Sequence, residues 1–431
     1  MALRLLSRDP NFDRQITELL AAKREISEDV DQTVRAIIAD VIARGDTALI
    51  EYTQRFDRMT VAASGLRISD AEIDAAIKQC DKPALDALTV ARDRIEAYHV
   101  RQKPSDERFT DALGVSLGHR WTAIEAVGLY VPGGTASYPS SVLMNAVPAK
   151  VAGVPRIVMV VPTPDGVLNP LVLAAARIAG ITEIYRVGGA QAVAALAYGT
   201  QTIAPVAKIV GPGNAFVAAA KRRVFGQVGI DMIAGPSEVL ILADGHANPD
   251  WIAADLLAQA EHDTAAQSIL VTNSASLGDS VADAVERQLK TLSRGEIAGA
   301  SWRDHGAIII VDTLESAVPL VDRLAPEHLE IEADNAETLA GMIRNAGAIF
   351  LGSHTPEAIG DYVGGTNHVL PTARSARFSS GLGVLDFMKR TSILSCTPES
   401  LRALGPSAIA LAESEGLGGH ARSVAIRLNL G

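Results

Sequence analysis

The chain has 431 residues, 48% of them hydrophobic, and this length exceeds one ordinary core, so we expect about two or three folding units. The apolar residues form no run near the roughly 20 that a membrane helix needs, and a formal net charge of -11 argues against a nucleic-acid partner, because neutralising phosphate needs a basic face. Two cysteines, Cys80 and Cys396, cannot build a disulfide framework, and the N-terminus lacks a signal-cleavage pattern, so we expect a cytoplasmic protein.

The N-terminal part of the chain predicts helices. Polar and apolar residues recur with helical character from about Val30 to Arg55. A second helix is expected to open at Ser69, because Ser69 and Glu72 have capping-box spacing and apolar residues recur from there toward Ala97. Neither segment carries a chemical motif, so we interpret both as scaffold.

From Ala123 onward, short β-rich runs alternate with Ala-rich helical runs in two successive series. This alternation predicts mostly parallel sheets with helices on both faces. The expected strands are Ala123–Tyr130, Arg156–Pro162, Glu183–Val187, Lys208–Val210, Val239–Ala243, Ser268–Val271, Ala307–Val311, Leu329–Ile331 and Ala348–Leu351. The expected helices are Ser141–Ala152, Pro170–Ala179, Ala190–Tyr198, Ala215–Val224, Pro249–Ala260, Leu277–Leu292, Leu314–Leu324 and Ala336–Asn345. After Thr397 a helical tail is expected that is too short to fold alone and should therefore dock on something.

The helical string DLLAQAEHD contains a pair of candidate metal ligands. Gln259 and His262 are three residues apart, so they share a helix face and can reach one ion, although a histidine in a helix is more often an ordinary residue. Asp361 and His368 flank a Gly-Gly turn, and His420 follows paired glycines, whose free backbone can aim such side chains at a site. A nitrogen and oxygen ligand set without thiolate suits zinc, although a Gln amide is unusual, and spacing alone does not assemble the set.

Glu327 and His328 lie side by side in LAPEHLEI, at an expected junction between a helix and a strand. An imidazole titrates near neutral pH and burial can raise a carboxyl pKa, so the two together are suited to proton transfer. The alternative interpretation of the same pair is a solvated turn.

Three glycine-containing turns follow expected strands and precede expected helices: YVPGG at Tyr130, VGGAQA at Gln191 and VGPGN at Asn214. Backbone N–H groups at such helix starts can face an anionic cofactor. None of the turns is a GxGxxG fingerprint, so nucleotide binding stays open at this point. Ser237, in AGPSEVL, lies between the two α/β series, which is a natural crevice for a ligand.

Read together, these strings resemble the histidinol dehydrogenase family. The resemblance follows the family's order from about Tyr130 onward, and the N-terminal helices match only in character. It implies two Rossmann-like α/β domains with parallel-rich sheets, N-terminal helices and a small helical C-terminal tail. The strings that carry it are YVPGGTASYPSSVLMNAVPAKVAGV, GGAQA, GPGNAFV, DMIAGPSEVL, LLAQAEHD, APEHLEI, GDYVGGTNHVLPT, FSSGLGVLDFMKRTSI and GLGGHARSV.

Four parts of the chain are expected on this basis. Residues 1–28 form an N-terminal helical arm, and residues 29–129 plus 238–380 form a first α/β domain that carries most metal and acid-base residues. Residues 130–237 form the NAD-binding α/β domain. Residues 381–431 form a tail domain that docks on the partner subunit.

The resemblance also implies roles for particular residues. One zinc ion per subunit is implied at Gln259, His262, Asp361 and His420. The implied proton-transfer pair is Glu327 and His328, and the implied NAD contacts are Tyr130, Gln191 and Asn214. Substrate contacts are implied for Ser237, His328, His368 and Glu415 together with the four metal ligands. The family is a homodimer, so Glu415 and His420 are expected to complete the neighbour's site.

The implied activity is the NAD-dependent, four-electron oxidation of L-histidinol through L-histidinal to L-histidine, in the last steps of histidine biosynthesis. We expect His328 to take the hydroxyl proton in the first half and Glu327 to deprotonate water in the second. A cysteine route is the rival for the second half, but neither Cys80 nor Cys396 has a flanking base. The alternatives are a same-family zinc and NAD dehydrogenase of another small polyol or amino alcohol, a zinc hydrolase and a non-catalytic binding protein.

Overall fold

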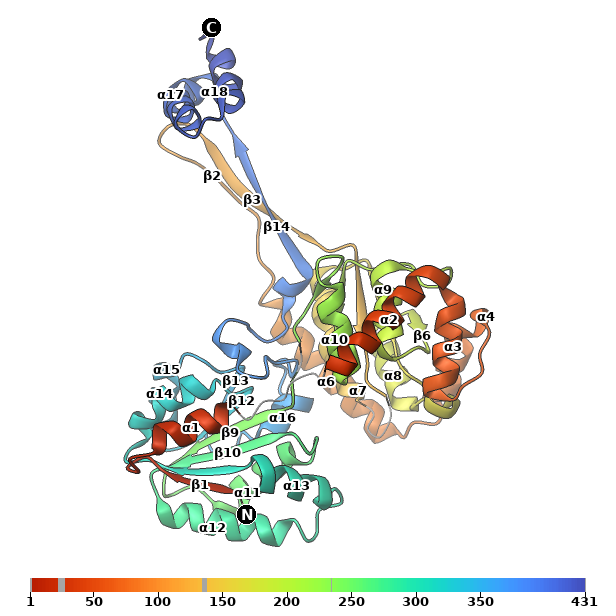
Figure 1. Cartoon of the computed structure of the whole chain (residues 1–431), viewed down its shortest axis with the longest axis vertical. Helices are drawn as coiled ribbons and strands as arrows, with labels where there is room; N and C mark the ends of the chain where they lie inside the picture. Colours follow the sequence, from red (N-terminus) through yellow and green to blue (C-terminus); the bar gives the residue numbers. More distant parts are fainter. Residues whose placement is uncertain (1, 22–27, 134–137, 234, 431) are drawn as a thin grey trace.

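The computed structural model describes residues 2–21, 28–133, 138–233 and 235–430. Figure 1 shows two sheets covered by helices, and a narrow three-stranded sheet that projects from them and leads to the C-terminal helices. Every strand pair of the two larger sheets is parallel. The expected fold class, two α/β units with parallel-rich sheets, N-terminal helices and a helical C-terminal tail, is confirmed. Among the described helices, none has both the length and the apolar character that crossing a membrane requires.

A five-stranded sheet has β4 (Ala126–Tyr130) at its centre, in the order β6-β5-β4-β7-β8. Every residue of β4 is buried, as expected for a central parallel strand covered on both faces. The chain moves outward from β4 to β6 and then returns to β7 beside β4, so the strand order reverses there, which is where open parallel sheets bind ligands. The other elements are β5 (Arg156–Val160), β6 (Glu183–Tyr185), β7 (Lys208–Val210), β8 (Gly229–Ile230), α7 (Pro139–Ala152), α8 (Pro170–Ala179), α9 (Gly189–Tyr198) and α10 (Ala215–Val224).

The helices of residues 28–100 pack on this same sheet. Val34 and Leu49 share a buried apolar cluster with Leu196 of α9, and Ile95 shares another with α7 and α8. This packing differs from the expected grouping of residues 29–129 with residues 238–380, because the apolar faces of these helices are covered by the helices of the five-stranded sheet. The elements are α2 (Glu28–Arg44), α3 (Asp46–Asp57), α4 (Ala63–Leu66), α5 (Asp70–Ile77) and α6 (Lys82–Val100).

The chain between α4 and α5 also extends the edge of the five-stranded sheet. Ile68 N donates to Ile184 O at 2.9 Å, so the backbone before α5 lies alongside β6. The capping box expected at Ser69 and Glu72 is confirmed, and it opens α5 directly after this pairing.

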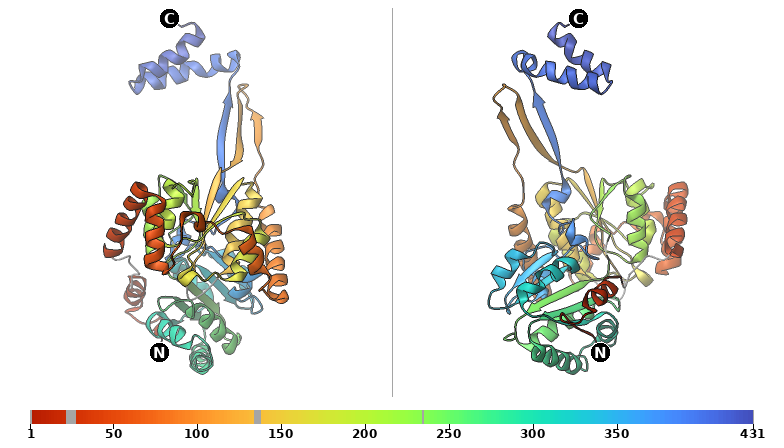
Figure 2. Two further views of the ribbon diagram at one scale, coloured as in Figure 1. Left: turned by 90° about the vertical axis from the view of Figure 1, so that its right-hand side faces the viewer. Right: turned by 60° about the vertical axis from the view of Figure 1, so that its left-hand side comes forward.

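A six-stranded sheet follows the order β1-β11-β10-β9-β12-β13. One of its faces packs on α1, α14 and α15, and the other packs on α11, α12 and α13. Figure 2 shows the two larger sheets from further sides. The elements are β9 (Glu238–Ala243), β10 (Gln267–Thr272), β11 (Ala307–Ile310), β12 (His328–Glu332), β13 (Ala348–Leu351), α11 (Pro249–Ala260), α12 (Ala275–Gln288), α13 (Gly295–His305), α14 (Leu314–Leu324), α15 (Ala336–Met342) and α16 (Glu357–Tyr362).

The N-terminus contributes a strand that the expectation of a helical arm at residues 1–28 leaves out. Strand β1 (Leu3–Leu6) pairs in parallel with β11 and forms the edge of the six-stranded sheet. Leu5 is buried while its neighbours are exposed, so a short alternating pattern suffices for an edge strand. Helix α1 (Phe12–Ala21) follows, and residues 22–27 of the expected arm lie outside the described residues.

The projecting sheet pairs segments that are far apart in sequence. Strand β3 (Ser116–Ala123) pairs antiparallel along its whole length with β14 (Met388–Ser395), and β2 (Glu107–Thr110) pairs with the other edge of β3. Helices α17 (Pro398–Ser414) and α18 (Gly418–Ala425) lie at the far end of this sheet, away from both larger sheets (Figure 1). Leu394, Leu411 and Ile426 are exposed there, so the C-terminal helices leave much apolar surface uncovered within one chain.

Candidate active site

His328 begins β12 and is the centre of a buried group of polar side chains. Its Nδ1 lies 3.0 Å from the backbone oxygen of Glu238, 3.7 Å from Oε2 of Glu327 and 3.7 Å from Oε2 of Glu357. Its Nε2 lies 3.4 Å from Oδ1 of Asp361. Burial opposes charge on the imidazole, but the three carboxylates outweigh it and hold the pKa of His328 well above its ordinary value.

Glu327 precedes β12 and is also buried. Its Oε2 accepts a hydrogen bond of 2.9 Å from the backbone N of Glu238 on β9, the neighbouring strand. Burial raises the pKa of Glu327 to about 7, against the lowering effect of the His328 charge. A carboxyl group tuned in this way can exchange protons near neutral pH. The adjacent pair Glu327 and His328 is therefore part of a buried polar group and not a solvated turn.

Gln259 and His262 lie at the end of α11, facing the same group. Nδ1 of His262 lies 3.1 Å from Oε1 of Gln259, and Nε2 of Gln259 lies 3.5 Å from Nδ1 of His328. Gln259 is fully buried, and burial lowers the pKa of His262, so this imidazole favours the neutral form in which a histidine ligates metal.

Asp361 and His368 approach from α16 and the loop after it. Burial raises the pKa of Asp361, but hydrogen bonding and charge from His328 outweigh burial and hold it below the ordinary value. Nδ1 of His368 lies 3.0 Å from the backbone oxygen of Asp361, and its Nε2 lies 3.1 Å from Oγ of Ser141. The structure therefore brings Gln259, His262 and Asp361 to one place, with His368 held beside them.

These three side chains fit part of a zinc site. They offer an amide oxygen, an imidazole nitrogen and a carboxylate, which are donors of the type that zinc accepts, although the amide is unusual. Three protein donors leave positions for a further ligand and a substrate. Glu415 ends α17 and His420 lies in α18, and both are exposed. These two helices lie away from the six-stranded sheet within the chain (Figure 1).

A cleft of about 1030 Å³ is large enough for a small ligand, but its lining includes none of Gln259, Glu327, His328 or Asp361. Phe350 lines the cleft, and its ring centroid lies 6.0 Å from that of His328. Gly360, next to Asp361, also lines it. Ser237 lies just before β9 and is half-buried, and its backbone oxygen accepts from Gln267 N at 2.9 Å.

The residues expected to contact NAD gather at the carboxyl edge of the five-stranded sheet. Tyr130 ends β4, and its hydroxyl accepts a hydrogen bond of 3.0 Å from the backbone N of Gly189 at the start of α9. Gln191 is buried in the first turn of α9, and its Oε1 has no hydrogen-bond partner among the described residues. Asn214 caps α10 by accepting from Phe216 N at 3.1 Å. All three lie near the reversal of strand order, where a nucleotide is typically bound.

Glu357 is a member of the buried group that sequence analysis missed. Burial raises the pKa of its carboxyl to about 8, although the charge of His328 lowers it. A signal was present in the sequence, because Glu357 and Asp361 are four residues apart and such a pair shares one helix face.

Comparison with known proteins identifies the chain's relationships. The family model described as histidinol dehydrogenase matches residues 20–428. The chain belongs to the histidinol dehydrogenase family. Histidinol dehydrogenases of Bradyrhizobium diazoefficiens and Mesorhizobium japonicum are 70% and 68% identical to it over 430 residues, covering 100% of this chain and of each relative. A solved histidinol dehydrogenase from Elizabethkingia anophelis has a TM-score of 0.95 at 36% identity, covering 99% of this chain and 98% of that one. The family membership expected from the sequence strings is confirmed.

Proposed function

We propose that the chain is an NAD-dependent histidinol dehydrogenase that oxidises L-histidinol through L-histidinal to L-histidine, in the last steps of histidine biosynthesis. The observation that carries the proposal is the buried placement of His328 between the carboxylates of Glu327 and Asp361, beside Gln259. This arrangement places candidate proton acceptors next to candidate metal ligands.

The proposed zinc ligands are Gln259, His262 and Asp361 of one chain and His420 of its partner. When bound, zinc would fix and polarise the substrate without changing oxidation state, and NAD would accept hydride. The neutral imidazole of His262 and the ionised carboxylate of Asp361 are both in the form that ligates a cation, as the lowered pKa values of both groups indicate. Proposed substrate contacts are Ser237, His368 and Glu415 with His328 and these ligands.

The alcohol half of the reaction needs a base beside the hydroxyl group. We assign this role to His328 in its neutral form, which would take the hydroxyl proton while hydride leaves the same carbon. The neighbouring carboxylates hold the pKa of His328 high, and a cation bound at Asp361 would offset part of their charge and lower that pKa. The aldehyde half needs water to attack the carbonyl carbon. We assign its deprotonation to Glu327, whose carboxyl pKa of about 7 suits a base near neutral pH. The hydrate then loses a second hydride, which completes the four-electron change.

The proposed NAD site lies at Tyr130, Gln191 and Asn214. Helices α9 and α10 begin beside these residues, and backbone N–H groups at helix starts favour an anionic pyrophosphate. The ends of β4 and β7 pack tightly here: a Cβ added at Gly211 would lie 2.1 Å from the backbone oxygen of Tyr130, and Gly211 has φ of +109°. Only glycine fits this turn between β7 and Asn214.

The projecting sheet suits a homodimer in which each C-terminal tail reaches the partner's site. Glu415 and His420 are exposed on the tail, and the exposed apolar side chains there, such as Leu411, would gain cover from a second chain. In this arrangement the partner's Glu415 would contact the substrate and the partner's His420 would complete the zinc site.

The test is NADH formation by the purified protein with L-histidinol, compared with a panel of small polyols and amino alcohols at equal concentration. We expect L-histidinol to be oxidised with the highest kcat/KM. Preference for another alcohol would assign the same apparatus to a different substrate. Hydrolysis of a substrate without any NADH would point instead to a zinc hydrolase.

A further inference from the structure

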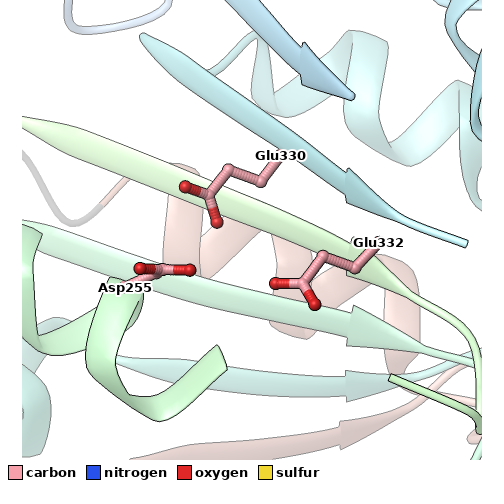
Figure 3. Close-up of side chains that lie close together, drawn as sticks. All are labelled: Asp255, Glu330 and Glu332. Carbon is pink, nitrogen blue, oxygen red and sulfur yellow. The ribbon is translucent and has the colours of Figure 1, made fainter. Parts of the chain in front are cut away.

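A second cluster of acidic side chains lies on the six-stranded sheet, outside the proposed zinc site. Asp255 of α11 and Glu330 and Glu332 of β12 point toward one another (Figure 3), and one carboxylate oxygen of each lies within 4.8 Å of the other two. Glu330 and Glu332 are buried and Asp255 is half-buried. Among the described residues, these three form the one group of His, Cys, Asp and Glu side chains placed closely enough to hold a metal ion.

The position of the cluster in the sheet is unusual. Strand β12 lies between β9 and β13 in a parallel sheet with both faces covered, where apolar residues are expected on both sides. Leu329 and Ile331 meet that expectation and join the apolar core on one face. Because side chains alternate along a strand, Glu330 and Glu332 instead place two carboxylates on the face covered by α11. Burying such groups without a compensating partner is costly.

The described protein groups around the cluster do not compensate for burying these carboxylates. Oε1 of Glu330 accepts a hydrogen bond of 2.6 Å from the backbone N of Glu357, but its Oε2 has no partner within the described part of the chain. Glu332 has 5% of its surface exposed, and no described residue bonds to its Oε2 either. Burial raises the pKa of Glu332 to about 7 and that of Asp255 to about 6, so the three carboxylates resist carrying their charges together.

We propose that Asp255, Glu330 and Glu332 bind a hard divalent cation of the Mg²⁺, Mn²⁺ or Ca²⁺ class. Carboxylate oxygens are the ligands that these ions prefer. Ligands on opposite sides of such an ion lie about 4–5 Å apart, which agrees with the spacing of the three carboxylates. The half-exposed Asp255 leaves a path for the ion and for water ligands. The unpartnered Oε2 atoms of Glu330 and Glu332 are the donors that the ion would satisfy.

The cation would be structural and would hold in place the helices that carry the active-site residues. It would join α11 to β12, and through the hydrogen bond between Glu330 and Glu357 N it would also hold the start of α16. These helices carry Gln259 and Asp361, one turn further along each of them. The two ions would share no ligand, so each site can be emptied separately.

The experiment counts bound metal. The full-length protein is saturated with zinc, freed of excess and titrated with Mn²⁺, and free Mn²⁺ is followed by its paramagnetic resonance signal. We expect total bound metal, zinc plus manganese, to reach two ions per chain, and Ca²⁺ or Mg²⁺ to compete for the second. Glu332→Gln should weaken Mn²⁺ binding about tenfold or more while zinc binding persists. Glu337→Gln, an exposed control on α15, should bind both ions as the wild type does.

Thermal unfolding distinguishes a folded variant that has lost the cation site from a variant that fails to fold. Because Glu332→Gln removes a buried charge, we expect its metal-free Tm to equal or exceed that of the wild type, while Mn²⁺ no longer raises it. Asp255→Asn should behave in the same way. One metal ion per chain in the wild type, or an unchanged Mn²⁺ affinity in folded Glu332→Gln, would overturn the proposal and leave protons as the neutralising partners of the cluster.

Discussion

Nε2 of His328 lies 3.4 Å from the carboxylate of Asp361. The proposed base of the alcohol reaction therefore adjoins a proposed metal ligand, and an alcohol oxygen held near Asp361 would be within reach of the imidazole. Glu327 approaches the other ring nitrogen, Nδ1, at 3.7 Å. Glu327 and the proposed metal ligand Asp361 thus lie at different nitrogens of one ring, so Glu327 can act on water separately from the ring nitrogen that faces Asp361.

Glu327→Gln should separate the two halves of the reaction. The amide keeps an oxygen that can accept from Glu238 N, so the fold is expected to persist, but it cannot take a proton from water. We expect L-histidinal oxidation to slow by about 10²–10⁴-fold and L-histidinol oxidation to aldehyde to change much less. Single-turnover measurements with each substrate test this, with the exposed Glu337→Gln as control. Equal slowing of both halves would contradict the division of roles.

The aldehyde half should also depend on pH through Glu327. A general base must be deprotonated, and burial raises the pKa of this carboxyl to about 7, so the rate should increase as pH rises through about 7. The residual rate of Glu327→Gln should lack this increase. The measurement is kcat for L-histidinal from acidic to mildly alkaline pH. A wild-type rate that is flat across neutrality would show that another group is the base.

Mixing two inactive variants should test the shared site. His262→Asn and His420→Asn each remove one proposed ligand, and a mixed dimer would hold one site with both ligands intact. After dissociation and reassociation of an equal mixture, we expect about a quarter of wild-type activity, since half of the dimers are mixed and one of their two sites is complete. No recovery after confirmed subunit exchange would mean that His262 and His420 act within the same chain.

Replacing both cysteines should leave catalysis nearly intact. Burial raises the pKa of the Cys80 thiol, which disfavours the nucleophilic thiolate, and Cys396 is exposed on the loop before α17. We expect Cys80→Ala with Cys396→Ala to retain kcat for both substrates within about twofold, because neither thiol has a role in the proposed chemistry. A large loss confined to L-histidinal oxidation would instead support the cysteine route, in which a thiol adds to the aldehyde to form a thiohemiacetal.

Much of the fold followed from local patterns. The alternation of strands and helices from Ala123 predicted both parallel sheets, and the strand ends at Tyr130 and before Asn214 meet at one sheet edge because carboxyl ends of parallel strands share an edge. The adjacency of Glu327 and His328 placed both at the start of β12. These features depend on residues close together in sequence.

Other features depend on contacts that no local pattern encodes. Strand β3 pairs with β14 more than 250 residues later in the chain. Most of β3 is half-exposed and most of β14 is exposed, so neither carries a strong buried pattern. The helices of residues 29–129 have apolar faces whose partner sheet is decided by tertiary packing, and the sequence could not distinguish the two sheets. The cluster of Asp255, Glu330 and Glu332 likewise appears only when α11 covers the face of β12.

The measurement that tests the account most directly is NADH formation from L-histidinol before and after removal of all bound metal. We predict that the untreated protein forms two NADH for each L-histidinol converted to L-histidine, that activity is lost on complete metal removal and that added zinc restores it. Activity that survives verified removal of the metal would contradict the proposed role of Gln259, His262 and Asp361.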